Sequence, residues 1–216
     1  MRDNSRRTPR AVAPANATTG LVAAKKVARH AAQEVRIIGG EWRRTPLAVP
    51  VSAGLRPTPS RVRETLFNWL GQDMHGWTVL DAYAGSGALG LEAASRGAAK
   101  VTLVERDPQL AKAIRATVAK LKAEDRVHCQ QGDAIAWMQQ MQRQGQTVDL
   151  IFLDPPFDDD VFEPALRAAV ACLPEGGYVY LESPRAHELA PETQLDLVKQ
   201  GQAGAVHFHL FRRRAD

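Results

Sequence analysis

The sequence predicts an α/β fold with a mostly parallel sheet and helices on both of its faces. From residue 77 onward, apolar runs of strand length alternate with segments of helical period, which is the pattern of βαβ units. A glycine-rich segment joins the first of these strands to its helix. The chain has 216 residues, 44% of them hydrophobic, which is enough for one domain with a small appendage.

The first 34 residues are predicted to form a basic tail. Residues 1–34 are rich in Arg, Ala, Thr and Pro, and they show neither the alternation of a strand nor the apolar segment of a secretory signal. We expect this tail to be disordered. An Arg-rich, acid-poor composition also fits an organellar transit peptide, so that alternative stays open.

Residues 35–76 are predicted to form an extension in front of a main domain at 77–216. An apolar stretch at 35–42 runs into a Gly-Gly pair and resumes at 47–50, which indicates a short hairpin or two edge strands. Thr58 and Pro59 then begin a helix, with Thr58 as its cap and the proline in the first turn.

One face of that helix is expected to be buried. Four apolar residues recur at spacings of four, seven and eight from the first, as on one side of a helix. Arg61 and Arg63 are expected to point away from this face. The four apolar residues are Val62, Leu66, Trp69 and Leu70.

The main domain is predicted to contain seven strands and four helices. We expect strands at residues 79–81, 100–105, 127–130, 149–153, 177–182, 195–199 and 206–212. We expect helices at residues 88–95, 107–121, 134–142 and 161–172. In a doubly wound sheet of this kind, the ligand lies at the carboxyl ends of the strands, where the strand order reverses.

The distribution of charge indicates a polyanionic partner. Residues 1–64 contain 13 Lys and Arg against 4 Asp and Glu, a net charge of +9, whereas the rest of the chain carries −5. A basic amino-terminal part followed by an acidic remainder favours nucleic acid as the partner, and a solvated tail is the alternative.

No run of about 18 apolar residues is present, which excludes a membrane-spanning helix. Two cysteines make neither a disulfide framework nor a Cys-rich zinc site, and we expect no metal.

A glycine loop follows the first strand of the main domain. Gly85, Gly87 and Gly90 match the pattern G-x-G-x-x-G between a predicted strand and a predicted helix. Glu105 ends the second strand, twenty residues after Gly85, where a carboxylate can accept hydrogen bonds from ribose hydroxyls. Two classes of ligand fit this arrangement, a dinucleotide and S-adenosylmethionine.

Four acidic residues at strand ends favour the second ligand. A dinucleotide carries an anionic pyrophosphate, whereas S-adenosylmethionine carries a sulfonium and an ammonium group with one carboxylate. Acidic side chains attract the cationic ligand and repel the pyrophosphate. Each acid can instead cap a helix or a turn, and the one before residue 134 fits a cap equally well. The four residues are Asp81, Glu105, Asp133 and Asp154.

The fourth strand of the main domain runs into Asp154-Pro155-Pro156-Phe157. Two prolines fix φ, remove two N–H groups and hold the preceding residues extended, which makes a stiff turn with free carbonyl groups. The alternative is a rigid turn without chemistry.

Such a turn suits the presentation of a planar aromatic amine to a methyl donor. The lone pair of a nucleobase amine is delocalised, so the amine is a poor nucleophile. The Asp154 carboxylate and the Pro155 carbonyl can accept its two N–H bonds and direct the lone pair to the sulfonium, while Phe157 stacks on the ring. The target base must first leave its stack or be unpaired.

With these motifs, the chain resembles the RsmD family of 16S ribosomal RNA (guanine-N2)-methyltransferases, within the class I S-adenosylmethionine-dependent methyltransferases. The resemblance spans residues 35–183, and its most specific part is the block 56–70; the Asp-Pro-Pro-Phe motif is shared with DNA adenine methyltransferases. The segments that carry it are residues 36–40, 55–58, 61–70, 81–92 and 154–157.

The resemblance implies a seven-stranded sheet with a final antiparallel strand and cytoplasmic action on one guanine of the small-subunit rRNA. It implies that Gly85 and Gly87 lie along the methionine part of the cofactor, that Glu105 holds the ribose and that Asp133 holds the adenine amine. The catalytic residues are then Asp154, Pro155, Pro156 and Phe157. The expected S-adenosylmethionine-binding residues are Asp81, Ala84, Gly85, Ser86, Gly87, Glu105, Arg106, Asp133, Ala134 and Asp154.

Basic residues of the extension are expected to hold RNA through its phosphates, without reading sequence. These residues are Arg36, Arg43, Arg44, Arg56, Arg61 and Arg63. The expected partner is small-subunit rRNA, free or in the subunit or its precursor, with no membrane partner and a monomeric enzyme. The alternatives are a DNA adenine-N6 methyltransferase, an NAD-dependent oxidoreductase and a non-catalytic RNA-binding module.

Overall fold

A computed structural model describes residues 35–50, 58–156, 161–187, 189 and 193–215. The expected tail, Arg56 and Phe157 lie outside these residues. From residue 34 onward the chain forms one compact unit, so the extension and the main domain belong to the same body. Among the described residues, no helix is both long and apolar enough to cross a membrane.

The extension begins with the expected hairpin. β1 (Val35–Arg36) pairs antiparallel with β2 (Pro46–Leu47), and the side chains of Val35 and Leu47 are buried. The strands are only two residues long because the segment between them turns toward a neighbouring helix instead of continuing the ladder. There the N–H groups of Glu41 and Trp42 donate to the carbonyl and hydroxyl of Ser95, at 2.7 and 2.8 Å.

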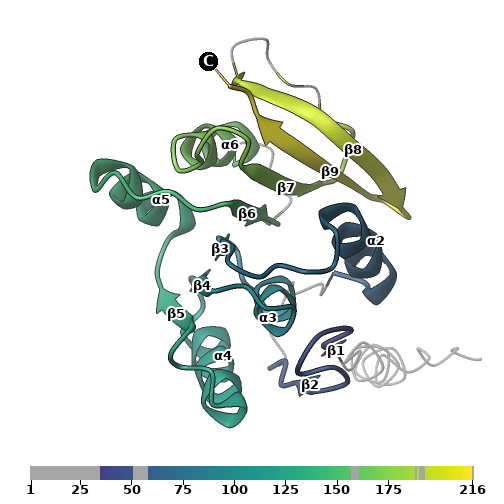
Figure 1. Cartoon of the computed structure of the whole chain (residues 1–216), viewed down its shortest axis with the longest axis vertical. Helices are drawn as coiled ribbons and strands as arrows, with labels where there is room; N and C mark the ends of the chain where they lie inside the picture. Colours follow the sequence, from purple (N-terminus) through teal and green to yellow (C-terminus); the bar gives the residue numbers. More distant parts are fainter. Residues whose placement is uncertain (1–34, 51–57, 157–160, 188, 190–192, 216) are drawn as a thin grey trace, which may run out of the picture. The chain divides into compact units, whose positions relative to one another are not determined.

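The main sheet has seven strands in the order β5-β4-β3-β6-β7-β9-β8 (Figure 1). Neighbours from β5 to β7 are parallel, and β9 is antiparallel to both β7 and β8, which confirms the predicted sheet. The strands are β3 (Thr78–Asp81), β4 (Lys100–Glu105), β5 (Val127–Gln131), β6 (Leu150–Leu153), β7 (Tyr178–Ser183), β8 (Leu195–Ala203) and β9 (Val206–Arg213). Only β8 is much longer than expected, because it pairs with β9 along most of its length.

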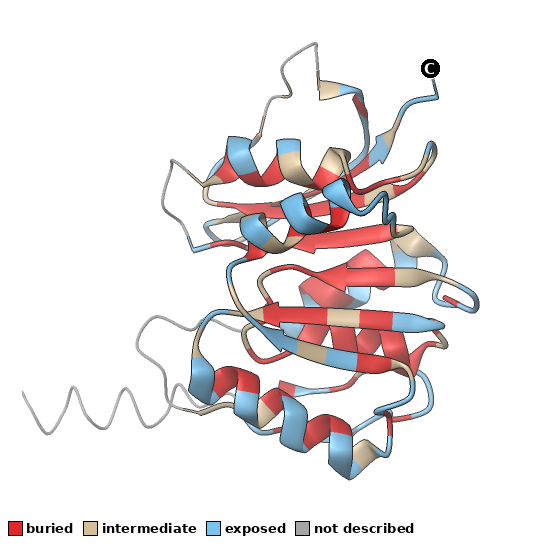
Figure 2. Cartoon of the chain, turned by 90° about the vertical axis from the view of Figure 1, so that its left-hand side faces the viewer, coloured by how far each residue is buried: buried red, intermediate tan, exposed pale blue. Residues whose placement is uncertain are grey.

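In the part of the chain that the structure describes, five helices cover the two faces of this sheet. They are α2 (Ser60–Leu70), α3 (Ala88–Ser95), α4 (Pro108–Leu121), α5 (Ala134–Arg143) and α6 (Phe162–Val170). The hairpin, α2, α3 and α4 share one apolar cluster with one face of the sheet, and α5 and α6 share a second cluster with the other. Figure 2 shows the result as buried strands between helices whose outer sides are exposed. All four residues of β6 are 0% exposed, as expected for a parallel strand covered on both faces.

The strand order reverses between β3 and β6. From β3 the chain proceeds through β4 and β5 toward one edge, and then returns to β6 beside β3 and continues to β7. The connections that follow β3 and β6 therefore diverge to opposite faces. In sheets of this kind the ligand binds in the crevice outside the carboxyl ends of these strands, and we use the word crevice for that place. The glycine loop and Asp154 both lie at this crevice.

The start of α2 differs from the prediction in two ways. Pro59, and not Thr58, is at the N-cap position, and no side chain caps this helix. Its buried residues are Val62, Arg63, Leu66 and Phe67, whereas Trp69 and Leu70 are half-buried. The expected face is therefore rotated by part of a turn, because an anion inside the protein draws Arg63 inward.

That anion is Glu92 of α3, which is 0% exposed. Its two carboxylate oxygens accept the N–H groups of Ile38 and Gly39, both at 2.7 Å. They also form ion pairs with Arg63 at 3.5 Å and Arg96 at 2.8 Å. One buried carboxylate thus joins the segment after β1, α2 and α3, which are far apart in the sequence.

Loss of the charge on Glu92 is expected to destabilise the fold strongly. Glu92→Gln keeps the shape of the side chain but leaves two buried guanidinium groups without an anion, which costs about 3–5 kcal/mol. Urea unfolding followed by circular dichroism measures this cost. Glu124→Gln, the same change at an exposed position, should alter the unfolding free energy by less than about 0.5 kcal/mol. Equal stability of the two variants would contradict the role given to Glu92.

Candidate active site

The glycine loop joins β3 to α3 at the crevice. Gly87 has φ +76°, a conformation that residues with a side chain rarely adopt, and it is the N-cap of α3. A Cβ atom on Gly90 would lie 3.0 Å from Leu103 and 3.1 Å from the Asp81 carboxylate. The backbone turn and the close packing of α3 against the sheet therefore both require glycine here, as the motif predicts.

Two acidic side chains hold this loop in place. Asp81, at the end of β3 and 2% exposed, accepts the N–H of Gly90 at 2.8 Å. Glu105, at the end of β4, accepts the N–H of Gly85 with one oxygen and that of Asp107 with the other, both at 2.7 Å. Each carboxylate oxygen has a second lone pair, so Glu105 can still accept a ribose hydroxyl.

Burial of Asp81 raises its pKa to about 7. Removal of the carboxyl group from water is the largest cause, the hydrogen bond from Gly90 opposes it, and the charges of Glu105 and Glu182 raise the pKa further. A carboxyl group in this state favours a cationic neighbour, because such a neighbour stabilises its ionised form.

The remaining cofactor-site residues are placed as follows. Ala84 and Ser86 are buried in the loop, and the N–H of Ala84 donates to the Val104 carbonyl at 2.9 Å. Asp133 is exposed after β5 and caps α5 by accepting the N–H of Ala136 at 2.9 Å, so one of its oxygens has the capping role. Ala134 is buried as the first residue of α5, and Arg106 is exposed.

These residues lie in a row, because β5, β4, β3 and β6 are consecutive in the sheet. The sheet places Asp133, Glu105, the glycine loop and Asp154 at the ends of these four strands. Asp81 pairs in register with Leu103 of β4 and Phe152 of β6, so Asp154 lies two residues beyond the partner of Asp81. The predicted cofactor residues and the predicted catalytic turn therefore meet at one crevice.

Asp154 is half-buried at the end of β6 and faces other acids. Its Oδ2 atom accepts the Thr58 hydroxyl at 3.4 Å. Burial is the largest cause that raises the pKa of Asp154 well above its usual value, followed by the charges of Glu182 and Asp81, and the bond from Thr58 opposes them. Pro155 is buried and Pro156 is exposed.

The sequence did not predict two residues of this site, Glu182 and Thr58. Glu182, the second-last residue of β7, lies beside Asp154, is 3% exposed, and accepts the Tyr180 hydroxyl at 2.9 Å. Thr58 reaches Asp154 from the segment before α2. Glu182 had the same signal as the four recognised acids, an acidic residue at the end of an apolar strand. Thr58 had none, because its contact spans 96 positions of the sequence.

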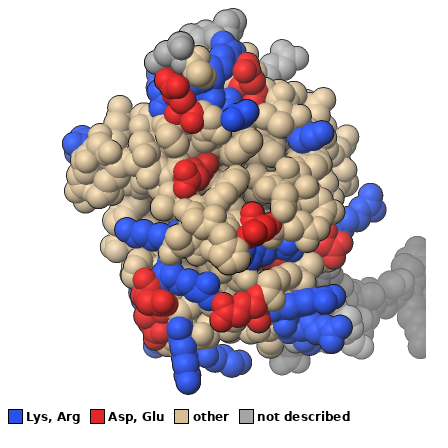
Figure 3. Space-filling model, in the orientation of Figure 1, with Lys and Arg blue, Asp and Glu red and all other residues tan. Residues whose placement is uncertain are grey.

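The arginines expected to bind RNA fall into two groups. Arg36, Arg43, Arg44 and Arg61 are exposed. Arg63 is 2% exposed and paired with Glu92, so its assignment to an RNA-facing surface is wrong. On the face of the molecule that Figure 3 draws, Lys and Arg lie mainly over the lower half, with acidic side chains among them. Figure 1, in the same orientation, places α4, β1 and β2 there.

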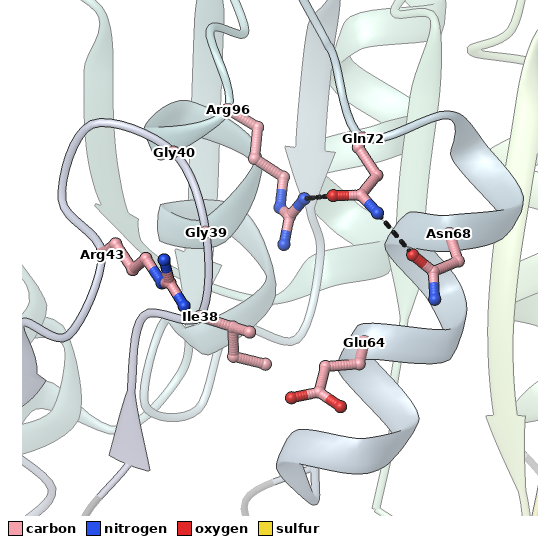
Figure 4. A pocket seen from close by; sticks show the side chains of 8 residues that line it. All are labelled: Ile38, Gly39, Gly40, Arg43, Glu64, Asn68, Gln72 and Arg96. Carbon is pink, nitrogen blue, oxygen red and sulfur yellow. Dashed lines mark hydrogen bonds between the residues drawn. The ribbon is translucent and has the colours of Figure 1, made fainter.

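A groove of about 560 Å³ lies between the segment after β1 and α2. Figure 4 shows Glu64 and Asn68 of α2 with Gln72, just after this helix, on one side of the groove, and Arg96 donates to Gln72 at 3.2 Å. The lining residues are Ile38, Gly39, Gly40, Arg43, Glu64, Asn68, Gln72 and Arg96. The groove is polar and open, and it is formed by the extension and by Arg96 at the end of α3.

A family model described as "Conserved hypothetical protein 95" matches residues 35–212. The chain belongs to this family. It is 38% identical to ribosomal RNA small subunit methyltransferase D of Escherichia coli (strain K12), over 88% of this chain and 96% of that protein, and 38% identical to the Haemophilus influenzae protein of the same name, over 83% and 94%. A solved structure of a putative methyltransferase from Escherichia coli superposes with a TM-score of 0.73, at 36% identity, over 85% of this chain and 99% of that one.

The predicted family and fold are thereby confirmed, and the cofactor is S-adenosylmethionine. The chemistry of the crevice fits this group. Asp81, Asp154 and Glu182 are carboxyl groups whose pKa values burial raises, so a cation beside them removes an electrostatic cost. When bound, the cofactor supplies a methyl group on a positively charged sulfur. That Glu105 holds its ribose and the glycine loop its methionine part stays a prediction.

Affinity for S-adenosylmethionine is expected to rise with pH between about 6 and 8. A cation binds the ionised form of Asp81 more tightly, so below the pKa of about 7 binding must first release a proton and weakens by up to about tenfold per pH unit. Titration calorimetry at several pH values measures this slope. S-adenosylhomocysteine has the same amino-acid part without the sulfonium charge, and its affinity should depend less on pH. Equal slopes for the two ligands would contradict the electrostatic account.

Proposed function

We propose that this protein transfers a methyl group from S-adenosylmethionine to the exocyclic N2 amine of a guanine in 16S ribosomal RNA. The observation that carries the proposal is the position of Asp154 and Pro155 at the end of β6, beside the cofactor crevice. The curated relatives of similar length are named for methylation of the small-subunit rRNA, which supports the same class of substrate here.

The turn after β6 provides acceptors and no competing donors. Pro155 and Pro156 lack N–H groups, so this turn offers their carbonyl groups and the Asp154 carboxylate as acceptors without competing backbone N–H groups from the two prolines. A guanine N2 amine that donates to Asp154 and to the Pro155 carbonyl is fixed in its plane, and its lone pair is directed out of that plane toward the methyl group. Phe157 is part of the proposal as the ring that stacks on the base.

The negative crevice argues against an NAD-dependent oxidoreductase, because a pyrophosphate would lie among Asp81, Glu105 and Asp154. The complete glycine loop and the carboxyl group of Asp154 beside it argue against a non-catalytic RNA-binding module. A DNA adenine-N6 methyltransferase uses the same turn, and its product is distinguished by the experiment below.

The substrate is proposed to be rRNA within the small ribosomal subunit or its precursor, with a monomeric enzyme acting in the cytoplasm. Arg36, Arg43, Arg44 and Arg61 are proposed to contact phosphates, because they are exposed and belong to the extension beside the crevice. Arg56 and the basic tail stay part of this proposal.

The proposal is tested with methyl-labelled S-adenosylmethionine and small subunits from cells that lack this modification. The rRNA is digested to nucleosides after the reaction, and the labelled nucleoside is identified. Label in N2-methylguanosine is the expected result. Label in an adenine product, or in a DNA substrate only, would overturn the assignment of the substrate while keeping the cofactor.

In the same assay, Asp154→Ala should lower the rate of methyl transfer by on the order of 10²-fold or more. The variant loses the acceptor that positions the amine, but it keeps the glycine loop and Glu105. Affinity for S-adenosylmethionine, measured by calorimetry, should change much less than the rate. Near-normal turnover of the variant would remove Asp154 from the mechanism.

Replacement of Arg43 and Arg61 by Ala should weaken binding of rRNA and reduce its dependence on salt. Each lost phosphate contact lowers the slope of log affinity against log salt by somewhat less than one, because fewer counterions are released. Filter binding at several salt concentrations measures the slope. Arg167→Ala, the same change at an exposed position on α6, is the control. An unchanged slope in the double variant would exclude these two residues from the RNA interface.

A further inference from the structure

Asp154 has a buried carboxyl group, that of Glu182, as its neighbour. β6 and β7 are parallel and pair Leu153 with Leu181, so the next residues, Asp154 and Glu182, extend side by side from the two strands. Glu182 is 3% exposed, and its Oε1 atom accepts the Tyr180 hydroxyl at 2.9 Å. The amine-holding function proposed above uses Asp154 and does not require Glu182.

The Thr58 hydroxyl lies between these two carboxyl groups. It donates to Asp154 at 3.4 Å and is also within hydrogen-bonding reach of Glu182. A hydroxyl group has one proton to donate, so it can stabilise only one of the two carboxylates at a time. Thr58 is 7% exposed, and water therefore has little access to this side of the pair.

The charged groups around the pair raise its affinity for protons. Asp154 faces Glu182 from β7 and Asp81 from β3, and Glu182 faces the Tyr180 hydroxyl on its own strand. Burial is the largest cause that raises the pKa of both groups, and the hydrogen bonds from Thr58 and Tyr180 oppose it. Two such carboxyl groups do not both ionise readily, and they titrate as a coupled pair.

We propose that Glu182 is a positioning residue that makes Asp154 the acceptor for the proton released by the substrate amine. This inference rests on the proposed function. In the step concerned, the amine lone pair forms the N–CH3 bond, and the S–CH3 bond breaks with its electron pair passing to sulfur. The amine then transfers one of its two protons to an Asp154 oxygen, from which the proton later leaves to solvent.

The charge of Glu182 acts at the stage at which a proton acceptor is needed. Asp154 is stabilised as an anion while a sulfonium lies in the crevice, so it can accept the N–H bond of the incoming amine. When the methyl group has moved, the sulfur is a neutral thioether and that stabilisation is gone. Glu182 and Asp81 then raise the proton affinity of Asp154, at the moment when the methylated amine has become acidic.

The test is the pH profile of methyl transfer by the full chain in single turnovers, with saturating cofactor and small subunits. Glu182→Gln keeps the size of the side chain and its bond from Tyr180 but removes the charge. We expect the acidic limb to move to lower pH and the plateau rate to fall on the order of tenfold or more. Affinity for S-adenosylhomocysteine should stay within a few-fold of that of the unmodified chain.

Thr58→Val is an independent test, in which the acidic limb of the pH profile should shift in the opposite direction. It removes the hydroxyl that stabilises the ionised pair, with little change in volume, so the acidic limb should move to higher pH. Glu175→Gln is the matched control: it is exposed in the turn before β7, at the opposite end of that strand from Glu182, and should leave the profile unchanged.

The outcomes separate this inference from the function on which it rests. If the unmodified chain forms no N2-methylguanosine, the proposed function fails. If it does and Glu182→Gln keeps both the midpoint of the acidic limb and the plateau rate, the role of Glu182 is overturned. If Glu182→Gln does not fold, Thr58→Val decides: a limb at higher pH supports the inference, and an unchanged limb overturns it.

Discussion

Repulsion among carboxyl groups at the ends of parallel strands is the constraint on which the site depends. Glu105, Asp81, Asp154 and Glu182 lie at or next to the carboxyl ends of four strands that are adjacent in the sheet, in the order β4, β3, β6 and β7. Hydrogen bonds from the glycine loop, Thr58 and Tyr180 offset part of the cost, and the raised pKa values of three of these groups show that a cost remains. A cationic cofactor removes it, so the same repulsion that strains the free site favours the ligand.

A further buried anion, Glu92, connects the extension to the main domain and so to the site at Asp154. Glu92 binds the backbone after β1 and the guanidinium groups of Arg63 and Arg96, and so sets the position of α2 on α3. Thr58, two residues before α2, is thereby brought to Asp154. The extension thus provides part of the environment of the turn proposed to be catalytic, in addition to the exposed arginines proposed for RNA. A change at Glu92 therefore has consequences at Asp154, through the placement of one hydroxyl group.

Much of the fold and the centre of the site could be predicted because their signals are local. The glycine loop, the acids at strand ends and the Asp-Pro-Pro turn each occupy a few consecutive residues, and the parallel sheet brings strand ends together by rule. The predictions failed at α2. The pattern placed Thr58 as a cap and Arg63 on the surface, since propensity at the start of a helix is a weak effect beside a buried ion pair.

The sequence by itself therefore determined the α/β class, the mostly parallel sheet, and the residues of the loop and the turn. The tertiary structure alone decided which polar side chains are buried and what they face. Arg63 became a structural residue and Thr58, Tyr180 and Glu182 became neighbours of Asp154. The physical reason is that burial and pairing energies of charged groups depend on atoms distant in the chain, whereas periodicity and turn chemistry depend on residues a few positions apart.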